Sequence, residues 1–160
     1  MTRRRTVLVV EDGTEYTEAF RRLTEGAVEE TVDFVRAADG GEARRLLAEQ
    51  PVDAVFLDVV FDRAAPDRLV GDLPALVSRF GGDRSRAERH LAESQGFYLL
   101  NELSSLLPDS VPVVLAYDFS AEPERLVELR RKRRRLSGVP DGARSTDVLG
   151  LLLRESAARD

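Results

Sequence analysis

Short apolar runs alternate with amphipathic stretches along the first third of the chain. Residues 7–10, 32–35 and 54–57 are β-branched or apolar runs of strand length, which predict buried parallel strands. Between them, apolar positions recur at helical spacing after Thr14, a candidate N-cap, and after Asp39-Gly40-Gly41. This alternation of strands and helices is typical of a doubly wound α/β sheet with right-handed crossovers.

The same pattern continues in the second half. Its apolar positions predict a helix from Gly96, a fourth strand at 112–116, a helix at 123–135, a short fifth strand at 136–139 and a last helix capped by Ser145 or Thr146. No internal repeat interrupts it. We therefore expect one α/β domain over residues 1–160.

Residues 62–94 depart from this pattern, because loops between a strand and the next helix are usually short. This insert has an apolar helical stripe, then Gly81-Gly82, then a charged helical run at 84–94; the stripe consists of Leu69, Leu73, Leu76, Val77 and Phe80. We expect an ordered helical hairpin whose second arm continues into the helix that contains Gly96. It either binds a partner or buttresses that helix.

Composition excludes several classes of function. The 160 residues include no cysteine and one histidine, His90, so thiol catalysis, disulfides and multi-histidine metal sites are excluded. No apolar run approaches the length of a membrane span, and no secretory signal is present, so we expect a cytoplasmic protein. The net charge of −5 makes nucleic-acid binding an unfavoured interpretation.

Three carboxylates follow the predicted first and third strands. Glu11 and Asp12 follow the first strand, and Asp58 follows the third. The carboxyl ends of parallel strands share one edge of the sheet, where ligands bind in such folds. Like charges gathered there raise one another's pKa or recruit a cation such as Mg²⁺, and an aspartate can then act as a nucleophile towards phosphorus. The alternative is that these residues only end strands and cap helices.

These segments resemble bacterial response-regulator receiver domains. The resemblance lies in Thr6-Val-Leu-Val-Val-Glu-Asp12, Val52-Asp-Ala-Val-Phe-Leu-Asp58, Gly96-Phe-Tyr-Leu-Leu and Val111-Pro-Val-Val-Leu-Ala116. It implies a flavodoxin-like, doubly wound, five-stranded parallel sheet in the order 2-1-3-4-5. It also implies phosphorylation of Asp58, with Mg²⁺ held by Glu11, Asp12, Asp58 and the backbone carbonyl of Val60.

Three switch positions depart from the family pattern. The switch hydroxyl falls on Tyr117, the lysine before a proline falls on Val139, and the aromatic switch residue falls on Leu136. Without the lysine and the hydroxyl, the usual coupling of the phosphoryl group to the output face is weakened. Asp118, next to Tyr117, is a candidate fourth carboxylate of the pocket. The resemblance is therefore to an atypical receiver.

Other features have two interpretations each. The basic run at 130–135 either binds an acidic partner or is a solvated helix end, which the helix dipole favours. His90 is either a phosphotransfer residue or, as we favour, a surface side chain. The leucines between Leu91 and Leu107 either pack in the core, the favoured interpretation, or form the seam of a homodimer.

The sequence thus predicts a stand-alone atypical receiver domain that signals through protein–protein contacts and is not an enzyme beyond self-phosphorylation and dephosphorylation. The implied partners are a sensor histidine kinase or phosphotransfer protein and a downstream protein of unknown identity. The alternative is a phosphorylation-independent pseudo-receiver that acts as an interaction module. A phosphatase of the haloacid-dehalogenase type is disfavoured, because Glu11 and Asp12 are adjacent and do not form an Asp-x-Asp motif.

Overall fold

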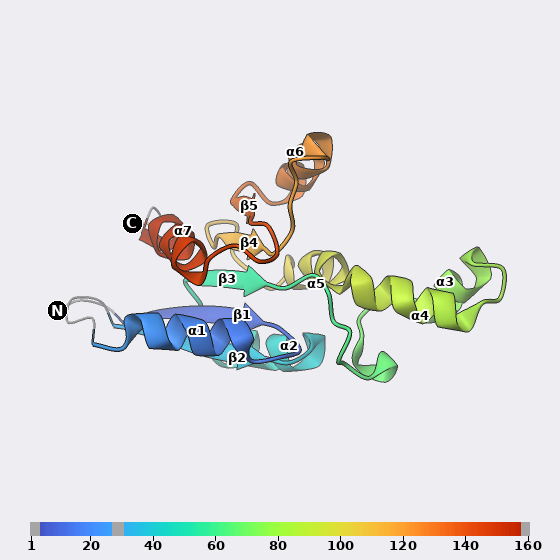
Figure 1. Cartoon of the computed structure of the whole chain (residues 1–160), viewed down its shortest axis with the longest axis horizontal. Coiled ribbons are helices and arrows are strands. Elements are labelled where there is room, and N and C mark those ends of the chain that lie inside the picture. The colour runs from blue at the N-terminus through green and yellow to red at the C-terminus, as the bar shows by residue number, and fades with distance from the viewer. Residues whose placement is uncertain (1–3, 27–30, 158–160) are drawn as a thin grey trace.

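The centre of the molecule is a five-stranded parallel sheet (Figure 1). The structure is a computed structural model that describes residues 4–26 and 31–157, so the ends of the predicted 1–160 domain lie outside it. The sheet order is β2-β1-β3-β4-β5, which confirms the predicted order. The strands are β1 (Arg5–Val10), β2 (Val32–Ala37), β3 (Ala54–Leu57), β4 (Val113–Leu115) and β5 (Leu136–Gly138).

Alternate residues of each strand point to opposite faces of the sheet, and both faces are buried. On one face, α1 (Glu15–Thr24) and α7 (Ser145–Ala157) cover a cluster that includes Val7, Val9 and Phe56. On this face the ring of Phe20 from α1 meets that of Phe56 edge-on at 5.6 Å. Such aromatic pairs add about 0.5–1.5 kcal/mol beyond the area they bury.

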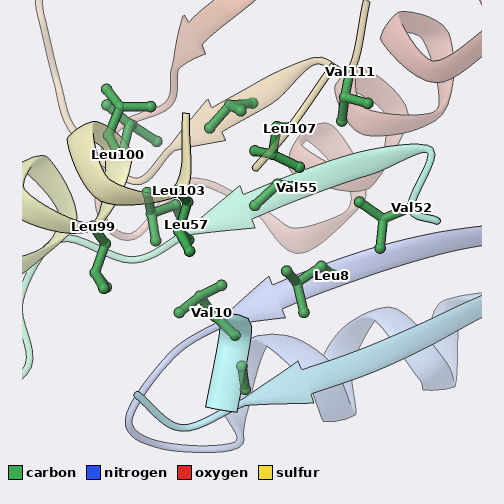
Figure 2. Close-up of a cluster of buried hydrophobic side chains, with 14 of the residues drawn as sticks. Leu8, Val10, Val52, Val55, Leu57, Leu99, Leu100, Leu103, Leu107 and Val111 are labelled. Carbon is green, nitrogen blue, oxygen red and sulfur yellow. The ribbon is translucent and has the colours of Figure 1, made fainter. Parts of the chain in front are cut away.

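The opposite face packs against α2 (Gly40–Glu49), α5 (Gln95–Leu103) and, through partly buried leucines, α6 (Pro123–Lys132). Figure 2 shows this cluster, in which side chains of β1 and β3 meet those of α5 and the following loop. Its labelled members are Leu8, Val10, Val52, Val55, Leu57, Leu99, Leu100, Leu103, Leu107 and Val111. Most of the leucines between 91 and 107 are thus used by the core, and Leu106 is exposed.

The segment after β3 contains a short 3-10 turn, η1 (Pro66–Arg68), followed by α3 (Leu73–Arg79) and α4 (Arg84–Glu93). The helices α3 and α4 contact each other and share a small core of Leu76, Ala87 and Leu91. They project beyond the carboxyl ends of the strands, in line with α5 (Figure 1). We call residues 73–93 the hairpin. It has its own apolar contacts and is joined to the domain at its base.

Two predicted helix boundaries differ from the structure. The expected stripe from Leu69 to Phe80 is helical only from Leu73, because Asp72 caps α3 by accepting a hydrogen bond from Ala75 N at 3.1 Å and Pro74 fits the first turn. The second arm of the hairpin and α5 were expected to be continuous. They are separated at Ser94, where α4 ends at Glu93 and α5 begins at Gln95.

Candidate functional site

The carboxyl ends of β1 and β3 bring the predicted acidic residues together. Glu11 and Asp12 directly follow β1, and Asp58 directly follows β3, its paired neighbour. The backbone N–H of Asp58 donates to Val10 O at 2.9 Å, so the strand pairing extends to the site itself. Val60 lies two residues further along, with its side chain exposed. The placement of this group follows directly from the parallel register of the two strands.

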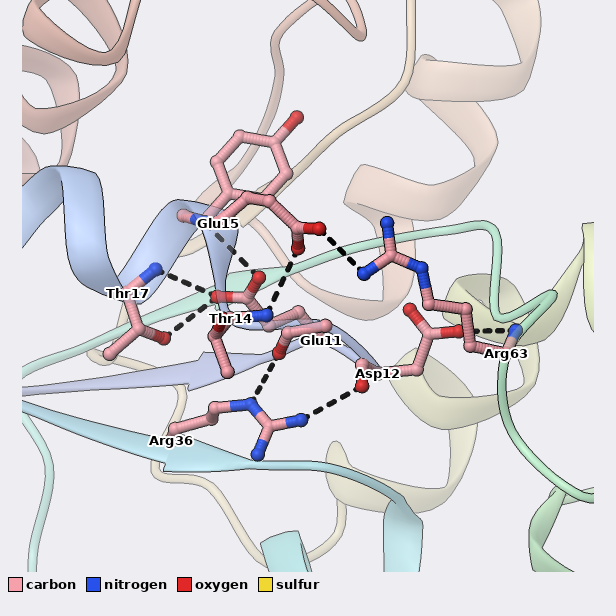
Figure 3. A network of polar contacts seen from close by, with 9 residues as sticks. Glu11, Asp12, Thr14, Glu15, Thr17, Arg36 and Arg63 are labelled. Carbon is pink, nitrogen blue, oxygen red and sulfur yellow. Dashed lines mark hydrogen bonds and ion pairs between the residues drawn. The ribbon is translucent and has the colours of Figure 1, made fainter.

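Glu11 is buried, with 1% of its surface exposed, and its carboxylate anchors the start of α1. Its oxygens accept hydrogen bonds from Tyr16 N at 3.1 Å, Thr17 N at 2.7 Å and Thr17 Oγ1 at 2.7 Å (Figure 3). Thr14, the expected cap, makes no side-chain capping hydrogen bond. The positive end of the helix dipole also stabilises a carboxylate near the first turn. Glu11 therefore does the capping that the sequence assigned to Thr14.

Asp58 is the most perturbed carboxylate of this group. Burial raises the pKa of Asp58 to about 7, against the hydrogen bond from Val59 N to its Oδ1 at 2.9 Å. The negative charges of Asp12, Asp141 and Glu11 raise this pKa further. A carboxyl group that is destabilised as an anion by burial and by like charges attracts either a proton or a cation.

Asp141 and Tyr16 belong to the site, although neither was predicted from the sequence. The Tyr16 hydroxyl donates to Asp141 Oδ1 at 3.2 Å, across the gap between α1 and the β5–α7 loop. Burial raises the pKa of Tyr16, and the charges of Asp141 and Asp58 add to the effect, so the hydroxyl keeps its proton. Asp141 lies just beyond the carboxyl end of β5, and this position is the signal that would have identified it.

Asp118, the expected fourth carboxylate, has a different role. It is exposed, and its Oδ1 accepts a hydrogen bond from Ser120 N at 2.9 Å. That bond lowers the pKa of Asp118. Asp118 therefore stabilises its own turn after β4, whereas the charge of Asp141 acts on Asp58.

Two arginines contact the segment that carries Asp12 (Figure 3). Arg36 donates to Asp12 O at 2.8 Å and also to the carbonyl of Gly13. The backbone N–H of Arg63 donates to Asp12 Oδ2 at 2.7 Å, while its guanidinium pairs with Glu15 at 2.5 Å. Arg36 thus binds the backbone of the loop between β1 and α1, and Arg63 contacts the side chains of Asp12 and Glu15 in the same segment.

Backbone contacts join the end of α4 and the start of α5 to the chain that follows Asp58. The N–H of Gly96 donates to Val59 O at 3.0 Å, and the N–H of Phe61 donates to Ala92 O at 2.8 Å. A Cβ atom at Gly96 would lie 2.5 Å from Asp58 O and 2.7 Å from Val59 Cα, both of them backbone atoms. Glycine is therefore required here, because α5 approaches the chain at Asp58 more closely than any side chain allows.

The three switch positions make their contacts with the core, with strand β4 and with α6. Leu136 is buried in the core, and Val139 continues the strand pairing by donating its N–H to Leu115 O at 2.8 Å. The Tyr117 hydroxyl bonds to Glu122 and accepts a hydrogen bond from Arg125 at 3.3 Å. Its ring packs edge-on against Phe97 at 5.0 Å. The hydroxyl of Tyr117 is therefore directed to α6.

The basic run is only partly a solvated helix end. Arg133 is 3% exposed and donates to the carbonyls of Leu107, Pro108 and Val111 at 3.0–3.3 Å. Arg130 and Arg135 also donate to backbone carbonyls, whereas Arg131, Lys132 and Arg134 are exposed. The structural role of Arg133 was not predictable from the sequence, because its acceptors lie more than twenty residues away.

The donor set at the strand ends suits a hydrated magnesium ion in its chemistry. Asp12, Asp58 and the Val60 carbonyl supply hard oxygen atoms, and Mg²⁺ commonly takes one or two carboxylates and keeps several waters. Within residues 4–26 and 31–157, no group of three or more acidic or histidine side chains is placed to hold a metal ion. This agrees with the use of Glu11 at the start of α1.

Comparisons with known proteins connect this geometry to a fold family. No family model matches the chain, and no curated protein matches its sequence. Among solved structures, the receiver domain of NtrX from Brucella abortus is similar over 96% of this chain and 99% of its own, with a TM-score of 0.60 and 18% identity. The fold is that of a receiver domain. A CheY-like receiver domain protein from Methanospirillum hungatei is similar over 98% and 97% of the two chains, with a TM-score of 0.60 and 14% identity.

A response regulator from Thermotoga maritima gives the same result, with a TM-score of 0.59, 17% identity and coverage of 97% and 99%. These identities are low, so the likeness concerns the receiver fold. In this chain the hairpin lies between β3 and α5, and Val139 directly follows β5. None of the helices within the described part of the chain is long and apolar enough to cross a membrane.

Proposed function

We propose that this chain is an atypical receiver domain that accepts a phosphoryl group on Asp58 with the help of Mg²⁺. The observation that carries this proposal is the convergence of Asp12 and Asp58 at the ends of paired strands, with Asp58 held at a raised pKa by burial and by its neighbours. Groups with perturbed pKa values gather at functional sites. Receiver-fold relatives support the same assignment.

Magnesium would be held by Asp12, Asp58, the Val60 carbonyl and water, with Glu11 assisting through a water molecule from its place at the start of α1. When bound, it neutralises the carboxylates and orients a phosphoryl oxygen. The chain itself supplies the nucleophile. An oxygen of the Asp58 carboxylate forms a bond to phosphorus, the bond from phosphorus to the donor breaks, and the donor group leaves with that electron pair.

The raised pKa of Asp58 makes a cation important to this chemistry. Without one, Asp58 is protonated to a large extent near pH 7 and is then a poor nucleophile. The Tyr16 hydroxyl donates to Asp141 and holds this carboxylate, one of the charges that raise the pKa of Asp58, in place. The donors of this phosphoryl group would be a sensor histidine kinase or a phosphotransfer protein, and the output would be contacts with a downstream protein.

The direct test is incubation of the protein with Mg²⁺ and phosphoramidate, followed by mass spectrometry for acid-labile phosphate. We expect one phosphate on Asp58. It should be absent from Asp58→Asn and present on the matched control Asp118→Asn, which removes an exposed carboxylate at the end of the next strand. A wild-type protein that gains no phosphate, or that gains it equally in Asp58→Asn, would contradict the proposal.

A second candidate is an interaction module that acts without phosphorylation. It is favoured by the switch positions, because the Tyr117 hydroxyl is used on the α6 side and Val139 offers no charge. Under this hypothesis a binding partner would bind wild-type and Asp58→Asn proteins equally, with or without phosphoramidate. A difference between the two proteins only in the presence of phosphoramidate would favour the first candidate.

A further inference from the structure

Arg63 places a guanidinium group beside the acidic site. It lies five residues after Asp58, in the loop that leads from β3 to η1. Its backbone N–H is fixed to Asp12 Oδ2 at 2.7 Å, and its Nη1 lies 2.5 Å from Glu15 Oε1. A Cβ atom on Gly13 would lie 2.5 Å from this Nη1, so the guanidinium passes directly over the Gly13 backbone. Figure 3 shows the contacts of Arg63 with Asp12 and Glu15.

The surroundings of Asp58 are short of positive charge. The largest effects of neighbouring charges on Asp58 come from Asp12, Asp141 and Glu11, all of them negative. A phosphoryl group on Asp58 would add further negative charge and several acceptor oxygens to this site. Arg36 is committed to the carbonyls of Asp12 and Gly13 and supports the loop from its other side. Arg63 is bonded through its backbone to Asp12, whose charge acts on Asp58, and it is the cation of this loop that we consider as a partner for the added charge.

The ion pair between Arg63 and Glu15 is weak. The side chains of Arg63 and Glu15 are each 62% exposed, and ion pairs between exposed groups contribute little to stability because water screens them. A phosphoryl group offers oxygens that match the planar fork of a guanidinium, in shorter and stronger charge-assisted bonds. The exchange would be a rotation of the Arg63 side chain, while its backbone stays bonded to Asp12.

We propose that Arg63 binds the phosphoryl oxygens at Asp58, exchanging its ion pair with Glu15 for the phosphoryl group. The inference rests on the proposed function, because it needs a phosphoryl group at Asp58. It assigns to the β3–η1 loop a charge that strand β5 does not supply, since Val139 stands at the end of that strand. Glu15 then acts as a competitor that keeps the guanidinium off the site until the phosphoryl group arrives.

The test compares Arg63→Ala, Arg63→Lys and Glu15→Gln with wild type, using Mg²⁺ and phosphoramidate and following the rate of phosphate incorporation on Asp58. Arg63→Ala should slow it by about tenfold or more, as expected for the loss of a hydrogen bond to a charged group. Arg63→Lys should recover part of the rate. Glu15→Gln should raise the rate, because it releases the guanidinium. Arg68→Ala, which removes another exposed arginine, at the end of η1, is the matched control and should react like wild type.

A purely structural role for the ion pair gives a different result, since Arg63→Ala and Glu15→Gln would then change the rate in the same direction. That outcome, or an unchanged rate in Arg63→Ala, overturns the inference while leaving the proposed function intact. In wild type, the Arg63 Nε–H signal in a ¹⁵N-resolved NMR spectrum should shift on phosphorylation, and an unmoved signal also overturns the inference. If wild type gains no phosphate, both proposals are wrong.

Discussion

Replacing Asp58 with asparagine should stabilise the protein above pH 7 and have little effect near pH 4. Burial and three neighbouring charges raise the pKa of Asp58 to about 7 in the folded protein, from an ordinary value of 3.8. The folded state therefore binds this proton more tightly than the unfolded state. The contribution of Asp58 to stability is most favourable at low pH, falls between about pH 4 and pH 7, and is fully unfavourable above pH 7.

The size of the effect follows from the same two values. At about 1.36 kcal/mol for each pKa unit, the difference between 3.8 and about 7 corresponds to roughly 4 kcal/mol. Asp58 is partly exposed, and solvent screening reduces this to about 2 kcal/mol. Asparagine has the same shape, and its side-chain oxygen can still accept the hydrogen bond from Val59 N. Asp58→Asn should therefore be about 2 kcal/mol more stable than wild type at pH 8.

The assay is urea unfolding followed by circular dichroism at pH 4, 6 and 8, with a chelator present to remove divalent cations. Asp118→Asn is a useful control, because the hydrogen bond from Ser120 N lowers the pKa of Asp118 and gives its carboxylate the opposite dependence on pH. A difference in unfolding free energy between Asp58→Asn and wild type that is the same at pH 4 and pH 8 would refute the reasoning. Addition of millimolar Mg²⁺ should stabilise wild type and reduce the advantage of Asp58→Asn.

Two further outcomes are expected. Arg133→Ala should lower the unfolding free energy by about 2–4 kcal/mol, because it leaves buried carbonyls without donors, while Arg134→Ala, the exposed neighbour, should change it by less than about 0.5 kcal/mol in the same urea assay. Asp141→Asn should lower the pKa of Asp58, since it removes one of the like charges; a carboxyl ¹³C titration of Asp58 measures this, and an unchanged midpoint would show that Asp141 is screened from it.

The strands of this protein were predictable because their signal is local. A run such as Ala54–Leu57 is apolar at every position, and the structure buries all four residues. The meeting of Asp12 and Asp58 was predictable for a related reason, since a parallel sheet puts strand ends on one edge. The order of the strands followed from the resemblance to receiver domains, and the hydrogen-bonded pairs confirm it.

The details of the site were less predictable, because they depend on contacts between distant residues. Thr14 is a residue type that often caps helices, but here the free amide of Thr17 in α1 donates to the Glu11 carboxylate instead. Asp118 and Asp141 both follow strands, and only the path of each loop decides which charge acts on Asp58. The break at Ser94 was likewise invisible in a sequence that is helical on both sides.

Backbone hydrogen bonds attach the base of the hairpin to the chain that directly follows Asp58, so the hairpin extends from a fixed point beside the site. Val59 and Phe61, which follow Asp58, are bonded to the backbone on either side of the Ser94 break, so the chain after the site is attached directly to the base of the hairpin. The ten residues of α4 span about 15 Å, and a rotation of roughly 10° at this fixed point moves the far end by roughly 2.5 Å. A rotation at this point would therefore displace the tip of the hairpin, which lies beyond the carboxyl ends of the strands, further than its base.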